Sequence, residues 1–150
     1  MTATLEAKAD VPAVNFVGMS HEGIPCRVQD VDACVKFFVD VLGCTLMPRP
    51  KKLDEMGSGA WLIDANRRVQ FHLIGNDEAA PPPGTPASPA GRHTSYWVED
   101  IEQFKKRLDM LGVKWGSVEI VEGAPQVFVL DPAGYTWEIT QELPSPAGSP

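Results

Sequence analysis

Cysteine is scarce in this chain, and the few present follow no binding pattern. Only Cys26, Cys34 and Cys44 occur, and no two of them form a Cys-x-x-Cys pair. An odd number of cysteines without such a pair fits neither a disulfide framework nor a zinc knuckle. We therefore expect all three to be small buried side chains.

Positive charge is also in short supply. Lysine and arginine number 13 against 20 aspartates and glutamates, so the formal net charge is −7. Nucleic-acid and anionic-membrane surfaces need a basic patch, but the short basic runs at 67–68 and 105–107 lie beside acidic residues. No apolar run reaches the length of a membrane span, and the first residues do not read as a signal peptide. We expect a cytoplasmic protein with no nucleic-acid or membrane partner.

The most informative pattern present is a motif that occurs twice, in residues 27–43 and 91–112. Each copy begins with a short run in which apolar and other residues alternate, and this run ends in Val-x-Asp. A stretch with apolar residues three and four positions apart follows, and Leu-Gly ends the copy. This order predicts a strand, a helix and a helix stop. Asp30 and Asp100 are expected N-caps, and Gly43 and Gly112 are expected left-handed residues after each helix.

Periodicity predicts the other elements. Spacings of three and four predict helices over 31–42 and 101–111. Alternation predicts extended chain over 14–28 and strands over 44–47, 60–63, 69–74, 93–98, 113–115, 118–121, 126–130 and 135–140. Residues 48–52 and 56–60 are expected loops, and Asp131-Pro-Ala-Gly134 predicts a tight turn.

These elements predict an α+β fold made of two βαβββ modules, which form a concave mixed sheet around a metal site. The expected organisation is a flexible tail (1–13), a first module (14–78), a Pro-rich linker (79–91), a second module (92–142) and a flexible tail (143–150). The linker contains five prolines, which exclude a helix or an inner strand there.

Four potential metal ligands fall at comparable places in the two modules. His21 and His93 lie in the first strand of their modules, while His72 and Glu138 lie in the last. A single strand histidine is more often an ordinary core or surface residue, but here all three histidines of the chain fit the repeat. Imidazoles and a carboxylate that converge on one point would bind Fe, Ni, Co, Mn or Zn.

Two further residues are candidate substrate-binding groups. Arg27 shares strand parity with His21 and could bind an anionic group of a substrate. Trp97 shares parity with His93 and could line the same pocket. The other tryptophans are expected to pack in the core.

With these residues in view, the chain resembles the vicinal oxygen chelate superfamily, which includes glyoxalase I, methylmalonyl-CoA epimerase, extradiol dioxygenases and fosfomycin- and bleomycin-resistance proteins. The resemblance covers about Val17 to Gln141. Its most specific parts are Val28-Gln-Asp-Val-Asp, Lys36-Phe-Phe, Val41-Leu-Gly, Gly91-x-His, Val98-Glu-Asp and the run from Gln126 to Thr140.

The resemblance implies a divalent-metal site with ligands at His72, His93 and Glu138. The chain departs from the family at the first ligand. The interval from His93 to Asp100, counted back from Asp30, ends at Gly23. His21 lies two residues earlier and keeps the strand parity, so a bulge could bring it to the metal; otherwise the site has three protein ligands.

The leading functional prediction is a metal-dependent glyoxalase-like enzyme of the lyase or isomerase type. It would chelate neighbouring oxygens of a small-molecule substrate and stabilise an enolate-like intermediate, with Glu138 as ligand and catalytic base. One alternative is an Fe(II)-dependent extradiol-type dioxygenase. Another is a metal-free protein that sequesters a drug. A homodimer is expected because members of this family commonly pair.

Overall fold

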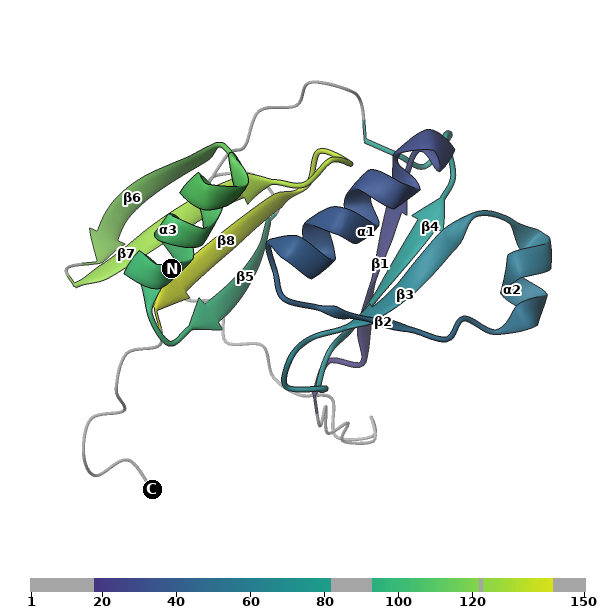
Figure 1. Cartoon of the computed structure of the whole chain (residues 1–150), viewed down its shortest axis with the longest axis horizontal. Helices are drawn as coiled ribbons and strands as arrows, with labels where there is room; N and C mark the ends of the chain where they lie inside the picture. Colours follow the sequence, from purple (N-terminus) through teal and green to yellow (C-terminus); the bar gives the residue numbers. More distant parts are fainter. Residues whose placement is uncertain (1–17, 82–92, 122, 142–150) are drawn as a thin grey trace, which may run out of the picture.

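The computed structural model describes residues 18–81, 93–121 and 123–141. The first module consists of β1 (His21–Cys26), the 3-10 turn η1 (Val28–Asp30), α1 (Val31–Asp40), β2 (Thr45–Met47), α2 (Lys51–Met56), β3 (Gly59–Ile63) and β4 (Gln70–Gly75). The second consists of β5 (His93–Val98), α3 (Ile101–Leu111), β6 (Trp115–Val121), β7 (Ala124–Leu130) and β8 (Thr136–Gln141). Figure 1 shows the two modules side by side.

Each module forms one mixed four-stranded sheet, with the strand orders β1-β4-β3-β2 and β5-β8-β7-β6. The first and last strands of each module are parallel, and the other pairs are antiparallel. A right-handed crossover through the helix is the ordinary way to join such a parallel pair. The identical orders confirm the predicted α+β fold of two βαβββ modules, with the described strands divided between two sheets.

The helix-bearing faces of the two sheets share a single core. The ring of Phe38 in α1 lies 5.2 Å from the ring of Trp137 in β8, and Phe71 in β4 lies 5.7 Å from the same Trp137. Arg107 of α3 donates a hydrogen bond to the carbonyl of Asp40, at the end of α1. We refer to the opposite face of each sheet, which is turned away from this core, as its outer face.

The two helices begin differently, although their motifs are similar. The carboxylate of Asp100 accepts from the amides of Glu102 and Gln103, both at 2.9 Å, as an N-cap should. Asp30 occupies the predicted N-cap position of α1, but its carboxylate caps no amide, because η1 precedes α1 and gives this residue a helical backbone. Its carboxylate pairs instead with Arg27, at 2.6 Å.

Both predicted glycine stops are confirmed. Gly43 and Gly112 adopt left-handed backbones, with φ of 71° and 66°. The predicted turn before β8 is also present, since the amide of Gly134 donates to the carbonyl of Asp131 at 3.0 Å. The three cysteines are buried, as expected.

Some local predictions differ from the structure. Helix α2 occupies part of a predicted loop. Pro50 lies just before its first turn, where a proline does not disturb a helix. Residues 115–121 form one strand where two were expected, with an irregular register near its end. The tails at 1–13 and 143–150, and most of the linker, lie outside the described residues. No described helix is long and apolar enough to cross a membrane.

Candidate functional site

Two of the predicted ligands lie together on the outer face of the first sheet. The ring of His72 is stacked between two other rings. On one side is His21, with centroids 4.3 Å apart and planes inclined by 16°. On the other is Trp61, at 4.1 Å and 6°. The antiparallel register explains this, because Trp61 is the direct partner of His72 on β3.

The environment of His72 favours the neutral imidazole. Partial burial, and then the nearby positive charge that His21 would carry, lower the pKa of His72 below its ordinary value. Nε2 of His72 lies 3.0 Å from Oε1 of Gln70, which helps to orient the ring. A neutral, oriented imidazole is the form that binds a metal ion.

The other two predicted ligands meet on the second sheet. Glu138 is almost buried, at 7% exposure, and its Oε2 lies 3.1 Å from Nε2 of His93. Its Oε1 accepts from the hydroxyl of Ser95 at 2.9 Å and from the amide of Gln126 at 3.0 Å. One carboxylate oxygen is thus held by neutral donors, while the other faces an imidazole.

The two pairs occupy equivalent positions in the repeat. On β1 and β4, Gly23 is the partner of His72, and His21 lies two residues before Gly23. On β5 and β8, Ser95 is the partner of Glu138, and His93 lies two residues before Ser95. By register, His21 therefore corresponds to His93, and His72 corresponds to Glu138.

This register also accounts for the two extra residues in the first module. The pairing of β1 with β4 is continuous over all six residues, so β1 contains no bulge of the kind considered for His21. The extra length is taken up after the strand, in η1 between Cys26 and α1. The helix begins later, and His21 reaches the side of His72 without any distortion of β1.

The chain does not bring the two pairs together. Among the described residues, no three His, Cys, Asp or Glu side chains are grouped so that they could hold a metal ion. The imidazole pair belongs to one sheet and the imidazole–carboxylate pair to the other. Each pair supplies two donors, which is fewer than a typical protein metal site provides.

The predicted substrate-binding residues differ in their surroundings. Arg27 follows β1 and is paired with Asp30, so it supports the entry to α1. Trp97 lies on β5 with the parity of His93, and it is 72% exposed. Their roles toward a substrate stay predictions.

Sequence reasoning missed three residues beside the predicted ligands: Trp61, Ser95 and Gln126. Ser95 could have been found from the sequence, because it lies two residues after His93 and therefore on the same face of the strand. The positions of Trp61 and Gln126 beside the ligands depend on which residues pair between neighbouring strands. The turns predicted from the sequence do not determine that pairing.

Comparisons with known proteins agree with this architecture. A glyoxalase family protein from Bacillus anthracis superposes with a TM-score of 0.70 at 21% identity, over 87% of this chain and 100% of the other. Lactoylglutathione lyase from Agrobacterium tumefaciens gives 0.60 at 18% identity, over 83% and 93%. TnmS3, an antibiotic-binding protein from Streptomyces, gives 0.65 at 16% identity, over 87% and 100%.

At such identities the structural neighbours establish the fold alone. A search among curated protein sequences finds no match. The family model described as the Glyoxalase/Bleomycin resistance protein/Dioxygenase superfamily matches residues 20–139, which is most of the sequence. Together with the duplicated βαβββ modules, this match shows that the chain belongs to the Glyoxalase/Bleomycin resistance protein/Dioxygenase superfamily.

Proposed function

We propose that this protein is a divalent-metal-dependent enzyme of the glyoxalase type, and that two copies of the chain complete its metal site. His21 and His72 of one subunit would join His93 and Glu138 of the second. The observation that carries the proposal is the register equivalence of the two pairs, which lie on separate sheets. A twofold pairing of unlike modules would set these equivalent positions face to face.

The residues fit a divalent transition metal. Three imidazoles and one carboxylate form a donor set suited to Zn, Ni, Co, Fe or Mn. The pKa of His72 is lowered, which keeps this donor neutral near pH 7. Ser95 and Gln126 hold one oxygen of Glu138 in place, as hydrogen-bonding neighbours of metal ligands commonly do.

The proposed chemistry is a proton transfer next to a carbonyl group of a small substrate. When bound, the metal would supply positive charge beside two neighbouring oxygens of the substrate and so stabilise an enolate-like state. The chain's own contribution would come from Glu138, whose Oε2 can accept a proton while Oε1 stays fixed. Nε2 of His93 lies 3.1 Å from this oxygen, so the two side chains would be neighbouring ligands.

The outer faces offer a surface that a second subunit would cover. Ile74 shares strand parity with His72 and is 45% exposed, and Trp97 shares parity with His93. Exposed apolar patches with a polar rim commonly mark surfaces that bind another protein. We therefore expect a homodimer, and a monomeric mass at micromolar concentration would contradict this.

Complementation between variants tests the shared site directly. His72→Ala and Glu138→Gln would be co-expressed with different tags, and the heterodimer would be isolated by sequential affinity steps. One of its two sites would then contain both changes and the other neither, so it should recover about half of the wild-type metal content. Each homodimer has no intact site. If all ligands came from one chain, the heterodimer would recover no metal.

A second candidate function is the binding of a planar molecule without catalysis. The flat side chains of Trp61 and Trp97 on the outer faces favour it, and TnmS3 shows that a protein of this fold binds an antibiotic. Metal content distinguishes the two functions. Less than about a tenth of an equivalent of transition metal after reconstitution would favour sequestration. Turnover of a catechol that requires Fe(II) and oxygen would instead indicate a dioxygenase.

A further inference from the structure

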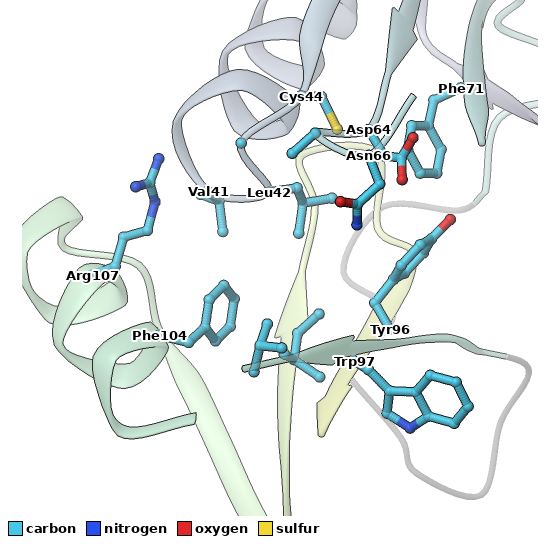
Figure 2. Close-up of a pocket in the computed structure, with 14 residues that line it drawn as sticks. Val41, Leu42, Cys44, Asp64, Asn66, Phe71, Tyr96, Trp97, Phe104 and Arg107 are labelled. Atoms are coloured by element: carbon cyan, nitrogen blue, oxygen red, sulfur yellow. The ribbon is translucent and has the colours of Figure 1, made fainter. Parts of the chain in front are cut away.

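A cavity between the two modules lies on the helix side of the sheets, away from the proposed metal ligands. Its volume is about 280 Å³, close to the lower limit for small-molecule sites. The end of α1 forms one wall, with Val41 and Leu42, and the second module forms the other, with Val98, Phe104 and Ile139. Trp97 is part of the lining, but Figure 2 shows its indole pointing away from the other labelled side chains.

Polar groups gather at one end of this cavity. Asp64, Asn66 and Tyr96 belong to the lining, and Figure 2 shows them on the side opposite Arg107. Oδ1 of Asp64 already accepts from two backbone amides of its own turn, at 2.7 and 3.0 Å. Its second oxygen, the amide of Asn66 and the hydroxyl of Tyr96 have no hydrogen-bond partner within the described parts of the chain.

The unpartnered hydroxyl of Tyr96 is the most informative of these groups. Its ring is packed against Phe71 and Trp137, and burial, followed by the negative charges of Glu22 and Asp64, raises its pKa. The phenol is therefore a neutral donor at all ordinary pH values. The buried side-chain atoms without a partner in the described parts of the chain do not include this hydroxyl. It is therefore open to the cavity, where a ligand would bind to it.

A cationic group marks the opposite end. In Figure 2, Arg107 lies far from Tyr96, with Val41, Leu42 and Phe104 between them. Nε of Arg107 donates to the carbonyl of Asp40 at 2.7 Å, which holds the guanidinium at the rim. Its terminal nitrogens can still bind a carboxylate.

We propose that this cavity binds a small aromatic carboxylic acid with a hydroxyl group at the end opposite its carboxylate. The carboxylate would pair with Arg107, and the ring would lie between α1 and Phe104. The hydroxyl would accept a hydrogen bond from Tyr96 and donate one to Asp64. An ammonium group at that end could donate to Asp64 and to the hydroxyl oxygen of Tyr96, so tight binding of an amine would assign the site to a different class of ligand.

Occupation of the cavity would link the modules without touching the proposed metal site. The ligand would contact the end of α1 on one module and α3 and β5 on the other. Since it binds the folded chain, it should raise the melting temperature by mass action. Its binding does not depend on the proposed function, and should be the same in Glu138→Gln as in the wild type.

Titration of the wild-type protein with 4-hydroxyphenylacetate, followed by amide NMR shifts and calorimetry, tests the proposal. We expect a Kd on the order of 100 µM, with the largest shifts at Val98 and Phe104. Phenylacetate, which lacks the hydroxyl, should bind about fivefold more weakly. Tyramine, which lacks the carboxylate, should bind at least about tenfold more weakly.

Two variants and one matched control locate the contacts. Arg107→Gln should weaken 4-hydroxyphenylacetate about tenfold or more, and Tyr96→Phe about fivefold. Lys106→Gln removes the same charge from the neighbouring exposed position and should leave the Kd unchanged. No binding at millimolar ligand, shifts confined to the outer faces, or an unchanged Kd in both variants would overturn the proposal. Stronger binding of tyramine would overturn the assigned ligand class.

Discussion

The rings of His21 and His72 lie against each other, with centroids 4.3 Å apart and planes inclined by 16°. This contact follows from the position of the two residues on adjacent parallel strands, where His21 lies two residues before the register partner of His72. Trp61 closes the other side of His72. The stack therefore affects both the protonation of His72 and its ability to bind a metal ion.

Removal of His21 should make His72 easier to protonate. His21→Ala exposes the ring of His72 and removes a neighbouring positive charge, the two causes that lower its pKa. The pKa of His72 should therefore rise toward its ordinary value of 6.5. An NMR titration of the imidazole carbons measures it, and an unchanged pKa would contradict the role of the stack.

The lowered pKa of His72 also predicts a pH dependence of stability. As pH falls below 6.5, the unfolded chain takes up a proton at this position before the folded chain does. The unfolded state then carries more protons, so the free energy of unfolding falls until pH passes below the folded pKa. Urea unfolding at several pH values measures this slope. His72→Asn should flatten it, and an equal slope in both proteins would assign it to other groups.

His72→Ala and His93→Ala should each lose metal while they stay folded. Both side chains lie on outer faces, away from the shared core, so their removal weakens a site more than it disturbs packing. Metal content and circular dichroism measure the two effects. Lys52→Ala, at an exposed position of α2, is the control and should keep its metal. A variant with full occupancy would remove that histidine from the proposed site.

Glu138→Gln should fold normally, bind metal more weakly and lose turnover by several orders of magnitude. The amide can still accept from Ser95 and Gln126, but it presents neither charge nor a proton acceptor toward His93. Turnover with saturating metal is the measurement, and Glu99→Gln, at an exposed position, is the control. Wild-type turnover in Glu138→Gln would require the proposed site to be abandoned.

The unequal helix starts give a stability prediction. Asp100→Ala removes an acceptor for two amides and should cost about 1 kcal/mol. Asp30→Ala removes a partly exposed ion pair with Arg27 and should cost about 0.5 kcal/mol or less. Urea denaturation of the two variants measures the difference, and an equal cost would contradict the assignment of only Asp100 as a cap.

The local pattern of the chain was sufficient for much of the fold. Helix α3 has the predicted bounds, Gly43 and Gly112 take the left-handed backbones expected of them, and Gly134 ends the predicted turn. Alternation also put Trp137 and Ile139 in the core and Glu138 on the opposite face. These features depend on neighbours a few residues apart, whose geometry is encoded in the sequence itself.

The number of residues between equivalent positions did not predict the place of the first histidine, because the two similar segments differ in length. Measured back from Asp30, the histidine position of the first module should have been Gly23. The extra residues form η1 instead, because a short helical turn can absorb them without breaking the ladder between β1 and β4. The same turn is what prevents Asp30 from acting as a cap.

The sequence by itself determined the two modules, the helices α1 and α3, and the side of each strand on which His21, His72, His93 and Glu138 lie. Only the tertiary structure decided that the helix-bearing faces pack together, which separates the two ligand pairs and leaves a cavity beside Tyr96 and Arg107. The physical reason is the distance along the sequence between the residues that decide each feature. The face on which a side chain lies follows from the period of one strand, whereas the choice between two possible faces of a sheet depends on which large side chains, such as Phe38 and Trp137, fit against each other across modules.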